Sequence, residues 1–382
     1  MLQEDISDYL LWMISTGYSE STWENTERAL RCFSTFVRER NIPRDVIFTL
    51  DTLHAYQEQR GHTYTYAVKG LWRYLYEKGR ISQTLQRKKP RLPDVYEQYI
   101  PYYSKLKHPH YCSLLVLRRI LSAFNDYLEK KHICLSKLRI EDIDTFLIEY
   151  NRPYALKTQG GHRSYLRGFL RYLYQIRGIV HKDFAPLLLG APVYAQAKPP
   201  KFLRPQEVQR VFAGLKLSSA RGLRSYAMLL FIFTLGLRPK EISLISLDDI
   251  FFSKGQVSIK DRKATNPIIL PLPDITIKAI AAYLVGARPK STQRTLFLRH
   301  RAPYRPISPA AVSMDIKSCM RKANLTSSAY WLRHTYAQNL LERGTSIFEI
   351  KEMMGHDRIQ TAQCYIHIHT KLMREVLFNE TL

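Results

Sequence analysis

The sequence has few cysteines and no long apolar run, and both absences narrow the class of protein. Its 382 residues contain 5 cysteines, which lie far apart without a Cys-x-x-Cys pair. This spacing argues against a disulfide framework or a zinc module and fits a reducing compartment. The longest apolar stretch, Ala227 to Leu235, is far shorter than the ~18 residues of a membrane span, and the acidic N-terminus lacks the basic region of a signal peptide. We therefore expect a cytoplasmic protein with no membrane partner.

Acidic residues are also scarce. The chain has 58 Lys and Arg against 33 Asp and Glu, a net charge of +25. Residues 151–300 hold 25 basic and 7 acidic side chains, which is +18 of that total, whereas the first 100 residues hold 14 and 13. A merely solubilising surface would spread the charge evenly. The uneven excess favours a polyanionic partner, with nucleic acid as the leading candidate.

Residue clusters typical of metal or nucleotide chemistry are missing as well. The tract with the most candidate catalytic side chains has no carboxylate pair, no His-Cys cluster and no glycine-rich phosphate loop. His108-Pro-His110-Tyr-Cys112 has three ligand-type residues, but in one short loop they would need distant partners, and a polar interdomain turn explains them better. We expect neither a metal nor a small-molecule cofactor.

Proline marks the joints of the chain, whose length suits two or three domains. Residues 186–205 contain five prolines and read as a semi-extended linker, centred on residues 187–204. A weaker joint lies at residues 87–101. We expect segments at residues 1–98, 99–186 and 205–382.

The first two segments look like copies of each other. The stretch Phe33 to Ile42 matches Phe124 to Ile133, and Leu71 to Tyr76 matches Phe169 to Tyr174. The order of the matching pairs is preserved, which argues against chance similarity. Each copy is predicted to be a bundle of about four amphipathic helices.

The two copies differ in charge along their last helix. Arg163, Arg167 and Arg171 recur at every fourth residue of copy two, a stripe suited to phosphates, although a solvated helix face would look the same. At the matching positions copy one has Thr65, Lys69 and Arg73. Copy two is the better candidate for DNA binding, and copy one is either a weaker DNA clamp or a protein contact surface.

The third segment mixes helix and strand patterns. Helices are predicted over residues 205–215 and 223–235, and again after Ser308-Pro309 by capping logic. Residues 256–260 and 267–272 flank a polar turn and predict a hairpin, with residues 295–298 as a possible third strand. The expected fold is mainly α: two tandem helical bundles and an α-rich domain with a small antiparallel β-sheet.

Several motifs in this segment occur together in one order. They are Gly236-Leu-Arg-x-x-Glu-Ile, the hairpin ending Ile268-Ile-Leu-Pro-Leu-Pro273, Leu332-Arg-His-Thr-Tyr-Ala, Leu341-Glu-Arg-Gly, Met354-Gly-His and Thr361-x-x-x-Tyr365-x-His367. Together they resemble the catalytic domain of the tyrosine recombinases, the phage integrase family, over about residues 200–370. Singly, each would read as an ordinary surface or packing residue, so the combined spacing carries the resemblance.

The resemblance implies a role for each matching residue. Tyr365 would attack a scissile phosphate and form a 3′-phosphotyrosyl link, and Lys263 in the hairpin turn would protonate the leaving 5′-oxygen. Arg238 and Arg333 would hold the non-bridging oxygens, where two guanidinium forks stabilise the charge of the transition state. In the family, the His356 position contacts the phosphate and the Glu241 position supports the first arginine.

One position departs from the family pattern. Tyr330 stands where the family usually has histidine, three residues before the second arginine. A phenol, with a pKa near ~10, is no general base at neutral pH but can still donate a hydrogen bond to phosphate. We expect slower or differently timed chemistry. His334 lies about 100° around the helix from Arg333 and is expected to be a buried structural residue.

The resemblance further implies double-stranded DNA at specific sites as the partner, with a dimer on each site and a tetramer in synapsis. It predicts a nucleoid-associated recombinase or integrase, serving a mobile element through integration or transposition. The apolar residues after Met373 either dock on a neighbouring protomer or form a frayed terminus. Two alternatives stay open: a type IB topoisomerase-like relaxing enzyme, and a DNA-binding regulator with impaired catalysis.

Overall fold

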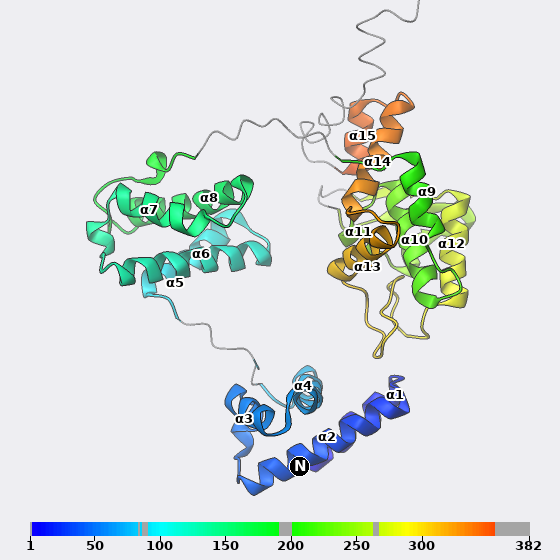
Figure 1. The fold of residues 1–382 in the computed structure, drawn as a ribbon, viewed down its shortest axis with the longest axis horizontal. Helices are drawn as coiled ribbons and strands as arrows, with labels where there is room; N and C mark the ends of the chain where they lie inside the picture. The colour runs from blue at the N-terminus through cyan, green and yellow to red at the C-terminus, as the bar shows by residue number, and fades with distance from the viewer. Residues whose placement is uncertain (1, 83–84, 86–90, 191–200, 263–266, 356–382) are drawn as a thin grey trace, which may run out of the picture. The chain divides into compact units, whose positions relative to one another are not determined.

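The computed structural model describes residues 2–82, 85, 91–190, 201–262 and 267–355 (Figure 1). The chain forms two compact units, one of residues Gln86–Gln196 and one that combines Met1–Leu85 with Ala197–Leu382. Among the described residues, no helix has the length and apolar character needed to cross a bilayer. We refer below to a first bundle, a second bundle and a C-terminal region that begins at residue 201.

The first bundle consists of helices α1 (Leu2–Ser15), α2 (Glu20–Glu39), α3 (Leu50–Arg60) and α4 (His62–Glu77), with the 3-10 turn η1 (Arg44–Val46) before α3. Their apolar faces enclose a core in which Leu30, Phe33 and Tyr56 are fully buried. The Tyr56 hydroxyl donates a hydrogen bond to the carbonyl of Ala29 (3.0 Å), so its polar end is satisfied within that core.

The second bundle consists of α5 (Asp94–Lys107), α6 (Tyr111–Lys130), α7 (Ile140–Asn151) and α8 (Leu156–Gln175), with the 3-10 turns η2 (Leu135–Lys137) and η3 (Ala185–Leu187). Helix α5 contains Pro101 and runs through residues 98 and 99. The joint expected at residues 87–101 is therefore shorter, and the segment boundary expected at residue 98 is misplaced. Tyr96 and Tyr99 pack on Phe169 of α8, and this burial holds the helix together across the proline.

The two bundles share an element order and a packing detail. Each has four helices with a 3-10 turn between the second and third. Tyr9 of α1 lies against Gly70 of α4 as Tyr99 of α5 lies against Gly168 of α8, and a side-chain carbon at either glycine would collide with the phenol oxygen. These common features favour the duplication, which stays a prediction.

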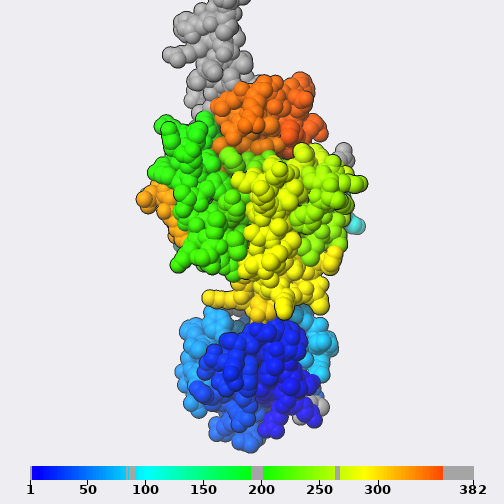
Figure 2. Space-filling model, turned by 90° about the vertical axis from the view of Figure 1, so that its right-hand side faces the viewer, coloured from blue at the N-terminus to red at the C-terminus, as the bar shows by residue number. Residues whose placement is uncertain are grey.

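The C-terminal region is built around one buried helix. Its helices are α9 (Pro205–Ala213), α10 (Ala220–Leu235), α11 (Pro239–Leu244), α12 (Asp274–Gly286), α13 (Pro309–Lys322), α14 (Ala329–Glu342) and α15 (Ile347–Met354), with 3-10 turns η4 (Leu247–Asp249) and η5 (Phe252–Lys254). Helix α10 is apolar on nearly all sides, and α12, α13 and α14 pack against it. Figure 2 shows α9 in green and α12 in yellow on one face of this region, with α14 and α15 in orange at one end.

A three-stranded antiparallel sheet has the order β1 (Ile250–Phe251), β2 (Gln256–Ile259) and β3 (Ile268–Pro271). Val257 pairs with Leu270, which confirms the predicted hairpin. The third strand expected at residues 295–298 is wrong, because β1 takes that place. Residues 295–298 instead divide their backbone hydrogen bonds between two partners, Leu296 N donating to Ile245 O (2.8 Å) and Ile307 N donating to Phe297 O (3.0 Å). The mainly α fold with a small antiparallel sheet is confirmed.

Candidate active site

Arg238 is placed by the junction of two helices. Helix α10 ends at Leu235 and is capped by Gly236, whose φ of +62° is a left-handed conformation that glycine adopts readily, and Pro239 begins α11. Arg238 is the N-cap residue between them. Its backbone N–H donates to Glu241 Oε2 (2.7 Å), its Nη1 to Glu241 Oε1 (2.7 Å) and its Nη2 to the carbonyl of Gly355 (2.9 Å).

Arg333 comes to the same place from α14. It is 3% exposed, and its two Nη atoms donate to the carbonyls of Gly236 and Met354. Its Nη1 also lies 3.8 Å from Glu241 Oε2. The two arginines that the motifs pair thus meet around one carboxylate, although they lie 95 positions apart in the chain.

Glu241 fixes both guanidinium groups. Its side chain is 2% exposed, and a carboxylate taken out of water at such a position is costly unless cations and hydrogen bonds compensate it. Arg238 and Arg333 supply that compensation, and in return their planes are oriented by a shared acid. The pair with Glu241 keeps a net positive charge, which suits an anionic ligand.

A third arginine, Arg262, completes the group at the end of β2. Its Nη1 donates to the carbonyl of Glu352 (3.2 Å) and its Nη2 to that of Met353 (2.7 Å). The last carbonyls of α15, residues 352–355, are thus all held by Arg262, Arg333 and Arg238. A helix C-terminus leaves such carbonyls unpaired and carries partial negative charge, which explains why three cations gather there.

Sequence reasoning did not single out Arg262. Burial is the main cause that lowers the pKa of its guanidinium, and Glu241 opposes that shift. No local pattern distinguishes this arginine from a surface residue, because its partners lie 90 positions away in the chain. Its only sequence signal is its place directly before Lys263.

Three predicted catalytic residues, Lys263, His356 and Tyr365, lie outside the described residues. The residues directly before two of them are described and lie close together. A side-chain carbon on Gly355, which precedes His356, would be 2.8 Å from Nη2 of Arg262, which precedes Lys263. The roles of these three residues stay predictions.

Tyr330 and His334 flank Arg333 on α14 but differ in exposure. Tyr330, in the first turn, is 52% exposed. His334 is half-buried, and burial together with the neighbouring Arg333 lowers the pKa of its imidazole to about 4, so the ring is neutral at neutral pH. This is consistent with a structural role for His334.

The three arginines of the predicted DNA-binding stripe on α8 differ in their exposure and in their hydrogen-bond partners. Arg171 is exposed. Arg167 donates from Nε to the carbonyl of Ala185 (3.1 Å) and from Nη2 to that of Leu188 (2.6 Å), so it anchors the segment after α8. Arg163 is partly buried, with Nη2 3.5 Å from Gln159 Oε1.

On α4, the corresponding residues of the first bundle are Lys69 and Arg73, and both are exposed. The ammonium group of Lys69 lies 5.9 Å from the centre of the Tyr66 ring. The buried Thr65 donates to the carbonyl of Gly61 (3.1 Å) and so faces the interior.

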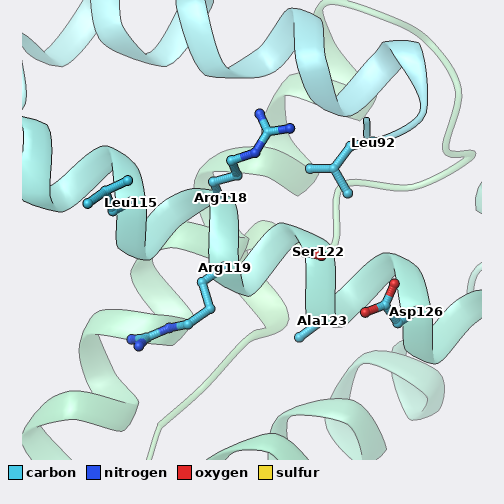
Figure 3. A pocket seen from close by; sticks show the side chains of 7 residues that line it. All are labelled: Leu92, Leu115, Arg118, Arg119, Ser122, Ala123 and Asp126. Carbon is cyan, nitrogen blue, oxygen red and sulfur yellow. The ribbon is translucent and has the colours of Figure 1, made fainter. Parts of the chain in front are cut away.

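The second bundle also has a cavity of about 380 Å³ beside α6 (Figure 3). Figure 3 shows Arg118 and Arg119 extending to opposite sides of this helix. Arg118 Nη1 donates to Glu97 Oε2 (2.9 Å), and this bond lowers the pKa of the Glu97 carboxyl. The charge of Arg118 is thereby paired within the second bundle.

No group of three or more potential metal ligands exists among the residues that the structure describes. His110, in the loop considered above as a metal site, is the N-cap of α6, and its Nδ1 accepts a hydrogen bond from the backbone N–H of Cys112 (3.3 Å). This agrees with the interpretation of the loop as a polar turn.

Comparison with known proteins identifies the C-terminal region. Residues 201–371 match the model of the phage integrase family. A candidate integrase/recombinase of Sinorhizobium fredii, y4rA, is 25% identical over 379 residues, which cover 95% of this chain and 90% of that protein. Tyrosine recombinase XerD of Staphylococcus saprophyticus is 29% identical over 298 residues, covering 75% of this chain and 97% of that protein. The match to XerD leaves out about a quarter of the chain, close to the length of one bundle.

Solved structures share the fold. A site-specific recombinase XerH bound to a palindromic difH substrate has a TM-score of 0.62 and 17% identity, and the match covers 81% of this chain and 89% of that one. A lambda integrase fragment, a dimer bound to a core site, has a TM-score of 0.56 and 16% identity, with coverage of 72% and 94%.

Proposed function

The chain belongs to the phage integrase family, the tyrosine recombinases, through residues 201–371, and from that premise we propose that it is a site-specific DNA recombinase. The observation that carries the proposal is the shared carboxylate of Glu241, which holds Arg238 and Arg333 in one cluster. Two fixed guanidinium groups can neutralise the charge that grows on a phosphate under attack, an effect worth several kcal/mol, on the order of 3 per donor.

In the proposed reaction, the Tyr365 hydroxyl loses its proton to solvent, its oxygen forms a bond to phosphorus, and the bond from phosphorus to the 5′-oxygen breaks. Lys263 gives its proton to the leaving 5′-oxygen, and His356 hydrogen-bonds the phosphate. The 3′-phosphotyrosyl link stores the energy of the broken bond, so that rejoining needs no nucleotide. Tyr330, exposed at the start of α14, is suited to donate a hydrogen bond to a phosphate oxygen.

We assign DNA binding to the second bundle through Arg171, with Arg163 and Arg167 supporting that surface. The first bundle, with Lys69 and Arg73 exposed, acts as a weaker clamp and accounts for the additional length relative to XerD. The relatives in solved structures are bound to DNA, and the lambda integrase is a dimer there, which supports an oligomer on DNA. A dimer on each site, a tetramer in synapsis, association with the nucleoid and service of a mobile element complete the proposal.

The proposal is tested by trapping the covalent link. The full chain is incubated in EDTA with a nicked duplex that contains the DNA flanking its native locus, because the nick lets the cleaved fragment diffuse away. We expect a protein–DNA adduct resistant to denaturant, and none with Tyr365→Phe. An adduct that persists in Tyr365→Phe would refute the nucleophile, and relaxation of any supercoiled plasmid without site preference would point to a topoisomerase.

Tyr330 favours one second candidate, a DNA-binding regulator of the same fold with impaired catalysis. A phenol cannot replace imidazole as a base at neutral pH. Site-specific binding without any adduct, unchanged by Lys263→Ala, would support this candidate. Restored cleavage in Tyr330→His would show that the rest of the cluster is intact.

A further inference from the structure

A second group of arginines lies near the N-terminal end of α10, away from the Arg238 cluster. Arg221 and Arg224 are in the first two turns of this helix, and Gly236 is 12 residues after Arg224. At 1.5 Å per residue this separates the two groups by about 18 Å along the helix. A cavity of about 690 Å³ opens there, between the start of α10, the segment of residues 299–307 and α13. We call it the arginine cavity.

Positive charge dominates the lining of this cavity. Its charged members are Arg221, Arg224, Arg299, Arg301, Arg305 and Asp315. Arg305 forms an ion pair with Glu77 (2.8 Å), so its charge is already compensated and is not counted in the net charge of the lining. The other four arginines against one aspartate leave +3.

Arg224 forms the fixed floor of the arginine cavity. It is 7% exposed, with Nη1 donating to the carbonyl of Leu298 (2.6 Å) and Nη2 to Asp315 Oδ2 (2.7 Å). Its Nε is buried and has no hydrogen-bond partner among the described residues, and the same holds for Nε2 of His300. Arg224 Nε therefore lacks an acceptor within the described protein, which is uncommon for a buried donor.

The rim of the cavity is open to solvent. Arg299 and Arg301 are exposed, and neither has an ion-pair partner within the described part of the chain. Arg221 reaches Asp315 Oδ1 (3.1 Å) with a side chain that is 72% exposed. The N-terminus of α10 adds partial positive charge, because the first N–H groups of a helix lack intrahelical acceptors.

We propose that the arginine cavity binds a phosphodiester of the DNA backbone, a contact that rests on the proposed function as a DNA recombinase. A fixed guanidinium with flexible guanidinium groups at the rim is suited to a phosphate at a defined position of a larger polyanion. The two arginine groups lie about 18 Å apart along α10, so this phosphate is a different one from that held by Arg238 and Arg333. The cavity sets the register of the duplex and takes no part in bond breaking.

The test measures how binding depends on salt. The full chain is titrated with a fluorescent duplex of random sequence at a series of salt concentrations, and the double variant Arg299→Gln, Arg301→Gln is compared with the native chain. Each lost phosphate contact lowers the slope of log affinity against log salt by about 0.9. We expect the slope of the double variant to be smaller than the native slope by about 0.9. The matched control, Arg210→Gln with Lys216→Gln, removes two exposed charges of the same region and should keep the native slope.

An unchanged slope in the double variant, or an equal loss in the control, overturns the proposal. A free anion is the competing occupant. If inorganic phosphate raises the melting temperature of the native chain and not of the double variant, while the DNA slope stays native, the cavity holds free phosphate and the DNA assignment is wrong. The adduct assay separates the two proposals: an adduct with an unchanged slope refutes only the cavity, and a shifted slope without an adduct refutes only the recombinase.

Discussion

The two arginine groups of the C-terminal region are each organised by one buried carboxylate, yet their guanidinium groups face different surroundings. Around the buried Glu241, Arg333 is buried and all three arginines hold carbonyls of α15 or Gly236. Around Asp315, 5% exposed, only Arg224 is buried, and Arg299 and Arg301 reach into solvent. The first group is rigid enough to stabilise a transition state, whereas the second can grip a backbone phosphate with little geometric demand.

The largest expected effect is the loss of adduct formation when Glu241 loses its charge, and it distinguishes Glu241 from Asp315. Glu241→Gln removes the charge that orients Arg238 and Arg333, and we expect adduct formation to slow by roughly 10²-fold or more. Breaking a buried ion pair also lowers the free energy of unfolding by about 3–5 kcal/mol. Single-turnover adduct formation and urea denaturation measure the two effects.

The matched change at the other carboxylate is Asp315→Asn. It leaves Arg224 similarly uncompensated, so we expect a comparable loss in the free energy of unfolding, but adduct formation on saturating DNA slowed by less than about tenfold. Equal catalytic losses in the two variants would contradict the division of roles between the groups.

A smaller effect tests Arg262 as a positioning residue. Arg262→Lys keeps the charge but loses the fork that holds Glu352 and Met353, so we expect slower cleavage. If Arg262 orients Lys263, a substrate with sulfur at the leaving 5′ position restores the rate, because a thiolate leaves without a proton. Lys254→Met, a change at an exposed lysine just before β2, is the control. A defect that persists on the sulfur substrate would place Arg262 with the phosphate-holding arginines instead.

The smallest expected effect is on the pH dependence of the free energy of unfolding. It comes from one histidine beside each arginine group. Burial, with Arg333 beside His334 and Arg224 beside His300, lowers the pKa of each imidazole to about 4 from 6.5. Between these values the unfolded chain binds a proton that the folded chain does not, so the free energy of unfolding falls as the pH drops from 6.5 toward 4. Both imidazoles are only partly buried, so solvent screening reduces the contribution of each histidine to this fall to about 1 kcal/mol.

Urea denaturation across that pH range checks the histidines. His334→Gln and His300→Gln should each flatten the dependence, and the double variant should add the two effects, since distant sites are independent. A pH dependence that neither variant changes would contradict the lowered pKa values.

Local signals made much of the fold predictable. Ser308 caps α13, its Oγ accepting from Ala311 N (3.3 Å), and the Ser346 to Glu349 capping box opens α15, as their spacing predicts. The alternating residues of β2 and β3 gave the hairpin. The errors arose where packing overrode a local rule: α5 continues through Pro101 because Tyr96 and Tyr99 are buried, and residues 295–298 divide their hydrogen bonds between two partners.

The candidate site divides in the same way. Motif spacing was enough to associate Arg238, Glu241 and Arg333, because the intervals along the chain carry that information. The packed helices were needed to show that Glu241 is shared by both arginines, that Arg262 joins them, and that Arg167 is tied to the carbonyls after α8. Capping and periodicity act over a few residues, whereas these contacts join segments 18 to 117 positions apart and exist only once the helices have packed.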